Sequence, residues 1–371
     1  MATLMIATKL AIAMQDSLLL FESSKTGWKT RESLKGTSPQ CVAFDPSNPN
    51  RVYCGTFGNG LWKTDDSGGS WDKIGKEEED SSNDSISNRT QVMSVSVSHI
   101  ERGKNGFNIV YVGTEPTALY RSDDGGESWQ RMSSINNLKS SSSWSFPPRP
   151  WTSHVRWIEP DKSNPGYVFA AIEAGALVQS RDGGRTWIDR VEGGPHDTHT
   201  LATHQKMPKR LYSSAGDGYF ESFDYGESWK RPMAGLYHHY LAGLALDSGD
   251  PQNIVVSASQ SALQAHSIEG ARSVVYRRTS SLSVEENDNS GQEKKWKLVS
   301  KGLPEPNGTI ISVLAANPKI SGEFYAVNNR GVFCSNDSGI SWKMLDEHDG
   351  IQWPNEYLSQ HPRALAVQDR T

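Results

Sequence analysis

Short apolar runs separated by turn residues form the pattern of this 371-residue chain. Runs such as 92–97, 109–112, 167–172 and 254–258 are each followed by a stretch rich in Gly, Asn, Asp, Ser or Pro. Short apolar runs bounded by turn residues are typical of β-strands, and none approaches the roughly 18 residues that a membrane-spanning helix needs. The pattern therefore predicts an all-β chain without a membrane span.

One turn motif recurs five times with the pattern Ser/Thr-x-Asp-x-Gly-x-Ser/Thr-Trp. Its aspartates are Asp66, Asp124, Asp182, Asp224 and Asp337. In such a turn the carboxylate accepts hydrogen bonds from backbone N–H groups, glycine adopts a positive φ, and tryptophan packs against a neighbouring sheet. We therefore assign these residues to turns and packing rather than to chemistry, and call the five motifs the aspartate turns.

The spacing of the aspartate turns predicts the architecture. Successive aspartates lie 58, 58, 42 and 113 residues apart, so the last interval holds two units, and the polar residues 279–295 replace one turn. Each unit contains four short strands with the turn between the third and fourth, which is the signature of a β-propeller blade. Strands at 7–16 and 18–21 complete a further blade with 363–369 and remove an open sheet edge. We predict that residues 1–371 form a single seven-bladed β-propeller domain, with six or eight blades as alternatives.

Charge and cysteine usage narrow the function classes. The net charge of -5, with Lys and Arg scattered, predicts neither a nucleic-acid partner nor a membrane partner. The three cysteines lack metal-ligand spacing and predict reduced thiols in a cytoplasmic protein, which we expect to be a monomer. Residues 1–21 superficially resemble a signal peptide, but Lys9 and Asp16 interrupt the apolar run, so we interpret it as paired strands. Four glycosylation sequons keep a secreted protein as the alternative.

The aspartate turns resemble the Asp-box repeat, also called the bacterial neuraminidase repeat, over nearly the whole chain. That repeat occurs in sialidases, xyloglucan hydrolases, sortilin-type receptor ectodomains and photosystem II assembly factors, so the resemblance implies a fold but not one function. Sialidases bind the substrate carboxylate with three arginines, one in an Arg-Ile-Pro type motif, and use a tyrosine nucleophile. No such motif precedes the first turn here, and no pattern ties Arg156, Arg330 and Arg363 together. We therefore do not expect sialidase activity.

Propeller topology sorts the remaining polar residues between two faces. The loops that lead into the inner strands, and the turns between second and third strands, share one face, called the start face here. The central channel opens there, which makes it the expected place for a site. Seven of the ten histidines fall on this face. The candidate catalytic residues on it are His154, Arg156, Glu173, Asp197, His199, Asp217, His239 and Tyr240.

Three hypotheses account for these residues. They could form a satisfied polar network lining the channel. They could bind a divalent metal through His154, His199 and His239, with Asp or Glu as a further ligand. They could perform metal-free acid–base chemistry, with Arg156 binding an anionic or carbonyl oxygen and Glu173 and Asp217 as a carboxylate pair. The loop 147–154, which includes Trp151, is expected to form part of the pocket rim.

We predict an enzyme acting on a small-molecule substrate in the channel, a hydrolase or lyase that uses His and Asp/Glu groups. A divalent metal is the candidate cofactor, and no nucleotide cofactor is expected. The alternative is a noncatalytic scaffold or assembly factor. Polar crowding of the channel favours the enzyme, because a scaffold does not require it.

Overall fold

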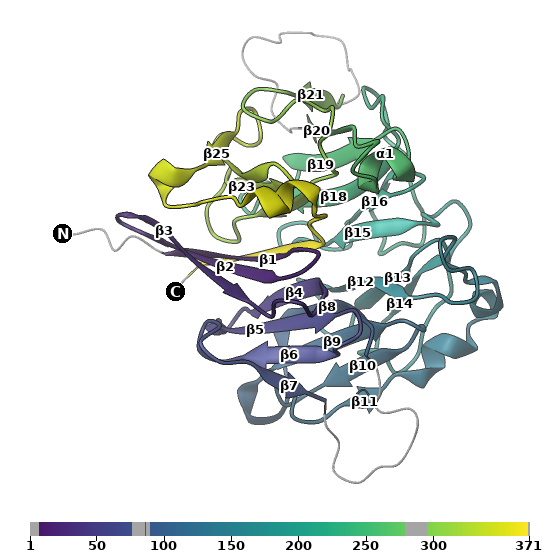
Figure 1. The fold of residues 1–371 in the computed structure, drawn as a ribbon. Coiled ribbons are helices and arrows are strands. Elements are labelled where there is room, and N and C mark those ends of the chain that lie inside the picture. The colour runs from purple at the N-terminus through teal and green to yellow at the C-terminus, as the bar shows by residue number, and fades with distance from the viewer. Residues whose placement is uncertain (1–6, 76–85, 87–89, 279–294, 370–371) are drawn as a thin grey trace.

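The computed structural model describes residues 7–75, 86, 90–278 and 295–369, and their strands form a seven-bladed β-propeller (Figure 1). The sequence-based fold is therefore confirmed. Blade 1 contains β4 (Pro39–Asp45), β5 (Asn48–Thr56), β6 (Leu61–Thr64) and β7 (Asp72–Ile74). Blade 2 contains β8 (Val92–Arg102), β9 (Asn108–Thr114), β10 (Leu119–Ser122) and β11 (Gln130–Arg131). In each blade the first-named strand is the innermost.

The later blades follow the same order along the chain. Blade 3 contains β12 (Val155–Pro160), β13 (Val168–Ile172) and β14 (Ala176–Ser180), and blade 4 contains β15 (Thr198–Ala202), β16 (Leu211–Ala215) and β17 (Gly218–Ser222). Blade 5 contains β18 (Tyr240–Leu246), β19 (Ile254–Ser259), β20 (Ser273–Arg278) and β21 (Lys297–Val299). Blade 6 contains β22 (Val313–Ala316), β23 (Phe324–Asn328), β24 (Gly331–Ser335) and β25 (Lys343–Leu345).

Both ends of the chain meet in blade 7. Its strands are β26 (Ala364–Asp369), β1 (Thr8–Ala13), β2 (Leu18–Ser24) and β3 (Gly27–Ser33). β26 pairs antiparallel with β1, with Val367 opposite Leu10, so the last strand of the chain is the inner strand of this blade (Figure 1). The predicted closure is confirmed, and β1 and β2 are the paired strands expected near the N-terminus.

Blades 3 and 4 differ from the predicted four strands. Where an outer strand was expected, the described residues form only isolated bridges, between Gln179 and Ile188 and between Glu221 and Lys230. The residues 279–295 that replace the turn of blade 5 lie almost entirely outside the described residues. The short helices are α1 (Ala262–His266), η2 (Lys104–Gly106), η3 (Ser133–Asn137), η4 (Lys139–Ser143), η5 (Glu347–Asp349) and η6 (Asn355–Ser359). No helix among the described residues is long and apolar enough to cross a membrane.

The hydrophobic core is divided into clusters that lie between neighbouring blades. Each of the seven blade-to-blade junctions has its own cluster of buried side chains. Leu10 of blade 7, for example, belongs with Tyr325 of blade 6, whereas Ala11 belongs with Val42 of blade 1. Successive side chains of a strand point to opposite faces of its sheet, so one strand serves two junctions.

The aspartate turns have the geometry expected of them. In blade 3, Asp182 Oδ1 accepts hydrogen bonds from the Ser180 hydroxyl at 2.8 Å and the Thr186 N–H at 2.9 Å, and Oδ2 accepts one from the Thr186 hydroxyl at 2.6 Å. Gly184 has a φ of 92°, and the Trp187 indole N–H donates to its carbonyl at 3.0 Å. The same Asp and Gly arrangement recurs in the other four turns. These residues therefore serve the fold.

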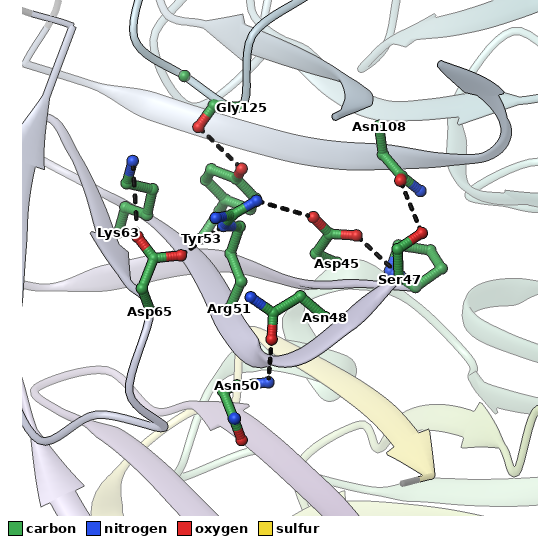
Figure 2. Close-up of polar contacts among 12 residues, drawn as sticks. Asp45, Ser47, Asn48, Asn50, Arg51, Tyr53, Lys63, Asp65, Asn108 and Gly125 are labelled. Carbon is green, nitrogen blue, oxygen red and sulfur yellow. Dashed lines mark hydrogen bonds and ion pairs between the residues drawn. The ribbon is translucent and has the colours of Figure 1, made fainter. Parts of the chain in front are cut away.

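Polar contacts supplement the apolar junctions on the opposite face. Figure 2 shows Tyr53 of blade 1 donating to the Gly125 carbonyl of blade 2 at 3.0 Å, and Ser47 donating to the Asn108 side chain at 2.8 Å. Within blade 1, the Arg51 guanidinium lies 3.3 Å from the Asp45 carboxylate and 2.5 Å from that of Asp65.

Candidate active site at the start face of the channel

The seven inner strands surround a cavity of about 980 Å³. On the start face it is lined by His154, Arg156, Glu173, His199, Tyr240, His266, His361 and Arg363. Toward the opposite face its wall includes Glu159, Lys162 and His204, which follow or end the same inner strands. The cavity therefore extends along the inner strands, and its start-face end carries the denser set of groups able to transfer protons.

β-Bulges aim two of these side chains into the cavity. In β12 the register shifts between Val155 and Trp157, so Arg156 is the extra residue, and in β15 it shifts between Thr198 and Thr200, so His199 is the extra residue. A bulge redirects a side chain that regular alternation would place elsewhere, and bulges are common next to active sites. The same shift occurs at Gln40 in β4 and Met93 in β8, and both residues also line the cavity.

Glu173 lies at the centre of the cluster. It follows β13, and its Oε2 atom lies 2.7 Å from Nε2 of His154 and 3.5 Å from Nε of Arg156. Burial opposes ionisation of this carboxyl, but the His154 hydrogen bond and the Arg156 charge outweigh it and hold its pKa well below the ordinary range. Glu173 is therefore a carboxylate at neutral pH.

His199 and Asp197 complete the cluster from blade 4. His199 Nε2 lies 3.5 Å from Asp197 Oδ2 and 3.9 Å from Glu173 Oε1, while Nδ1 lies 2.6 Å from the Leu241 carbonyl oxygen. A carbonyl only accepts, so Nδ1 carries a hydrogen. Burial disfavours the His199 imidazolium, but Asp197 and Glu173 outweigh it and raise the pKa above the ordinary value. Asp197 has a lowered pKa, because its contacts with His199 overcome its burial.

A hydrogen-bonded chain with one direction runs from Tyr240 to the loop before β26. The Tyr240 hydroxyl lies 2.8 Å from His266 Nε2, and His266 Nδ1 lies 2.6 Å from His361 Nε2. His361 Nδ1 contacts the Pro362 carbonyl and must donate to it. Burial and nearby cations lower the pKa of His361 well below its ordinary value. His266 is partly exposed, but desolvation of its ring, which stacks on His361, and nearby cations lower its pKa to about 4, so both rings are neutral. Neutral His361 then accepts from His266, and His266 accepts from Tyr240.

Arg363, which lies beside this hydrogen-bonded chain, has no counterion among the described residues. Its side chain makes no hydrogen bond or ion pair with the described residues, and its Nε atom is buried without a partner. Burial and the nearby Arg156 lower its pKa. Two guanidinium groups at one end of the cavity, of which only Arg156 faces a carboxylate, suit an anionic group of a bound molecule.

Glu115 and Arg149 support the cluster from blade 2 and the next loop. Arg149 donates to both oxygens of Glu115, at 2.7 and 2.6 Å, and Glu115 Oε2 lies 3.4 Å from Nδ1 of His154. The His154 side chain is 1% exposed, between this carboxylate and Glu173. The loop 147–154 thus contributes Arg149 to the cavity wall, whereas Trp151 is 80% exposed.

The structure brings together six of the eight residues chosen from the sequence: His154, Arg156, Glu173, Asp197, His199 and Tyr240. His239 and Asp217 lie outside the cluster. His239 is exposed, with its ring directed back to the Leu236 carbonyl at 3.1 Å, and Asp217 is exposed in the β16–β17 turn. The histidine trio of His154, His199 and His239 is therefore not assembled, nor is the pair of Glu173 and Asp217.

Five further residues join the cluster although the sequence did not single them out as catalytic. They are Glu115, Arg149, His266, His361 and Arg363. Four of them belong to start-face loops or turns, and His266 ends α1 in the connection between β19 and β20 on the same face; this shared face was the available signal. Which of the polar residues in those loops turn toward the channel depends on turn conformation, which residue type alone does not determine.

No family model matches the chain, and no curated protein matches it. Solved structures match its fold. An ancestral GH74 enzyme aligns with a TM-score of 0.58 and 16% identity over 89% of this chain, which spans 38% of that enzyme's length.

Two structures of YCF48 also align over most of both chains. The one from Cyanidioschyzon merolae has a TM-score of 0.54 and 14% identity, covering 83% of this chain and 85% of its own. The one bound to D1 peptide has a TM-score of 0.55 and 16% identity, covering 89% and 88%. At these identities the likeness establishes that the chain has the β-propeller fold shared by GH74 enzymes and YCF48.

Proposed function

We propose that this protein is an enzyme that performs acid–base chemistry, as a hydrolase or lyase, on a small anionic molecule bound at the start-face end of the channel. The observation that supports it most is His199. Its buried Nε2 atom makes no hydrogen bond to the residues that the structure describes, and it faces two carboxylates on a cavity wall. A satisfied structural network would not leave that atom without a hydrogen bond.

Each group has a role that its surroundings suit. His199 Nε2 and Glu173 would exchange a proton with the substrate, and Asp197 would stabilise the imidazolium that forms. Arg363 and Arg156 would bind the anionic group and stabilise negative charge that develops on oxygen. Tyr240, whose hydrogen is committed to His266, would accept a hydrogen bond from a substrate hydroxyl or amine. His154 would hold Glu173 in position.

A two-stage experiment tests this proposal. Thermal-shift screening of the full chain against phosphate esters, sugar acids and hydroxy acids would find stabilising compounds, and mass spectrometry would then follow their conversion. Glu173→Gln and His199→Ala should lower turnover by at least about 100-fold, within the range expected for a general acid or base. His239→Ala, which changes an exposed histidine outside the cluster, should leave it unchanged. Absence of turnover by the wild type, or wild-type turnover by the Glu173→Gln protein, would overturn the proposal.

A second candidate function is a noncatalytic factor that binds a polypeptide on the start face. Two observations favour it: a solved structure of the same fold is YCF48 bound to D1 peptide, and two start-face loops here carry exposed aromatics, Trp151 at 80% and Tyr237 at 77%. A peptide library measured by fluorescence polarisation distinguishes the two functions. Binding that is lost in a Trp151→Ser, Tyr237→Ser double variant but kept in His199→Ala supports the factor. Binding of no peptide eliminates it.

We further propose that the protein acts as a monomer in the cytoplasm, with no nucleic-acid or membrane partner. All three cysteines are free thiols, and Cys41 and Cys54 are buried, with pKa values raised mainly by burial. Inert reduced thiols suit a reducing compartment. Light scattering of purified protein tests the monomer, and fractionation of the source cells tests the compartment.

A further inference from the structure

We propose that Glu173 Oε1, Asp197 Oδ2 and His199 Nε2 bind a divalent first-row transition-metal ion such as Zn²⁺ or Mn²⁺. These residues each offer one ligand atom within 4.8 Å of the others. The inference deepens the proposed function and rests on it for the role of the ion in catalysis, whereas binding of the ion needs no substrate. With the ion bound, His199 Nε2 would be a ligand, and a water held by the ion would take over its proton exchange with the substrate. The site replaces the histidine trio expected from the sequence with one nitrogen and two oxygens.

The separation between His199 and Asp197 fits two ligands of one ion better than it fits a hydrogen bond, and Glu173 lies slightly farther from His199. His199 Nε2 lies 3.5 Å from Asp197 Oδ2 and 3.9 Å from Glu173 Oε1. Atoms bound at about 2.0–2.2 Å to a tetrahedral zinc lie roughly 3.3–3.6 Å apart, so the Glu173 carboxylate would need to move slightly toward the ion. His199 is 2% exposed, and its Nε2 atom makes no hydrogen bond within the described part of the chain. A metal ion between these atoms would satisfy the unpaired nitrogen.

The second polar atom of each residue is held by a hydrogen bond, which leaves the first atom available. His199 Nδ1 donates to the Leu241 carbonyl at 2.6 Å, so the lone pair of the neutral ring is on Nε2. Asp197 Oδ1 accepts from the Ala174 N–H at 2.7 Å, and Glu173 Oε2 contacts His154 Nε2 at 2.7 Å. Metal ligands in proteins are oriented by such outer hydrogen bonds, in particular a histidine N–H to a backbone carbonyl.

The donor set indicates the class of ion. Two carboxylates balance a charge of 2+, and the imidazole nitrogen favours zinc, manganese or iron over calcium and magnesium, which prefer oxygen ligands. Three protein ligands leave coordination positions open, as in catalytic rather than structural sites. Glu173 and His199 line the cavity, so an open position would face bound substrate. A water molecule in that position would be acidified by the ion and become a nucleophile.

The turn beside the cluster leaves room for the Asp197 carboxylate. A Cβ atom at Gly216 would lie 2.1 Å from Asp197 Oδ2 and 3.3 Å from Cε1 of His199. Gly216 also donates from its backbone N–H to the Asp197 carbonyl at 2.8 Å. A side chain at this position would displace the carboxylate, so Gly216→Ala alters the geometry of the site without removing a ligand.

Calorimetry on the full, tag-free chain tests the proposal. Protein dialysed against EDTA and then buffer is titrated with ZnCl₂ and, separately, with MnCl₂. We expect one ion per chain. We also expect His199→Asn, Asp197→Asn and Glu173→Gln each to weaken binding by more than the 10- to 100-fold that loss of an outer hydrogen-bond partner typically causes. His154→Ala should fall within that 10- to 100-fold range, and Gly216→Ala should weaken binding as well. His239→Ala should bind as the wild type does.

Defined results would overturn the site. No binding of either ion, or equal binding by wild type and His199→Asn, would mean that these ions bind adventitiously or not at all. Nitrogen-15 NMR that finds both His199 nitrogens protonated in excess ZnCl₂ would make the cluster an imidazolium paired with two carboxylates. Substrate turnover at the full rate in EDTA would rule out a catalytic role for the ion and leave the proposed function intact. Binding of one ion per chain without turnover of any compound would support the metal site and overturn the proposed function.

Discussion

The ring of His199 in blade 4 donates from Nδ1 to the Leu241 carbonyl of blade 5 across a distance of 2.6 Å. The Leu241 carbonyl lies where β18 also bulges, between Leu241 and Leu244. The next carbonyl, that of Ala242, accepts from the hydroxyls of Thr200 and Ser214, also in blade 4. The orientation of the candidate catalytic histidine is therefore fixed by the junction between two blades.

That contact predicts different stabilities for two substitutions of His199. His199→Ala removes the donor to the Leu241 carbonyl and should lower the free energy of unfolding by roughly 1–3 kcal/mol. His199→Asn places an amide N–H close to the position of Nδ1 and should recover most of that loss, although it lacks Nε2. Urea unfolding of the three proteins at neutral pH measures this. Equal losses for Ala and Asn would show that the hydrogen bond contributes nothing.

Arg363 predicts opposite effects on stability and on binding. Its guanidinium is partly buried beside Arg156 without a hydrogen bond or ion pair to the described residues. Arg363→Gln removes that repulsion and should raise the free energy of unfolding of the ligand-free protein by about 0.5–2 kcal/mol. The same change should weaken binding of anionic ligands roughly tenfold or more, because a charged hydrogen bond is lost.

The matched control for Arg363 is Arg330→Gln, an exposed arginine that does not line the cavity. Urea unfolding and calorimetry with inorganic phosphate and with the compounds found by thermal shift supply the two measurements. Destabilisation by Arg363→Gln together with unchanged anion affinity would mean that the arginine is structural.

The hydrogen-bonded chain from Tyr240 through His266 to His361 predicts that both histidine rings stay uncharged in mild acid. The pKa of His361 is held far below its ordinary value by burial and by the charge of Arg363, and that of His266 lies at about 4. Nitrogen-15 NMR should show both rings with the hydrogen on Nδ1 from neutral pH down to about pH 5. Tyr240→Phe should leave the His361 ring unchanged but shift the His266 Nε2 resonance.

The sign of the pH effect on stability follows from the lowered pKa of His361. The unfolded chain takes up a proton near the ordinary value of 6.5, whereas the folded chain does so only at much lower pH. The contribution of this ring to the free energy of unfolding is therefore present above pH 6.5 and falls as the pH decreases below it. His361→Gln should show a shallower loss of stability than the wild type on acidification to about pH 5. An identical pH slope in both proteins would contradict the assignment.

The fold could be predicted because its signals are local and repeated. Each aspartate turn fixes a hairpin through its own carboxylate, as Asp182 does with Thr186, and five copies at regular spacing determine the order of strands. The closing strand β26 was accessible from pattern alone, because an open blade 7 would expose the edge of β1. In contrast, the missing outer strands of blades 3 and 4 could not be predicted, because nothing local separates a two-residue bridge from a short strand.

The sequence predicted which face of the propeller holds the site, but not which side chains on that face point into the cavity. The sequence places His239 and His199 in equivalent loops, yet only His199 occupies a bulge that aims it into the cavity. Asp197 and Asp217 likewise belong to one blade, but Asp197 is held by the Ala174 N–H of the neighbouring blade, whereas Asp217 is exposed. Bulges and contacts between blades depend on non-local packing, which residue type does not encode.

The aspartate turns predict a contribution to stability that acid removes. The pKa of Asp182 is lowered because hydrogen bonds from Thr186 and Ser180 outweigh the opposing effect of burial. A carboxyl whose pKa is lowered in the folded state stabilises the fold at pH values above its ordinary pKa of 3.8. This contribution is lost as the pH falls through the folded pKa. Asp182→Asn, which cannot accept from the Thr186 hydroxyl through its amide nitrogen, should cost about 1 kcal/mol at neutral pH.

That cost should shrink as the pH falls toward about 3, because the wild-type carboxyl is then increasingly protonated as well. Asp217→Asn is the control, since this exposed aspartate lies in a turn of the next blade and its side chain makes no hydrogen bond with the described residues. Urea unfolding at a series of pH values measures the difference between each variant and the wild type. A loss in Asp182→Asn that stays constant from neutral to acid pH would assign its stabilising effect to packing of the turn rather than to the charged carboxylate.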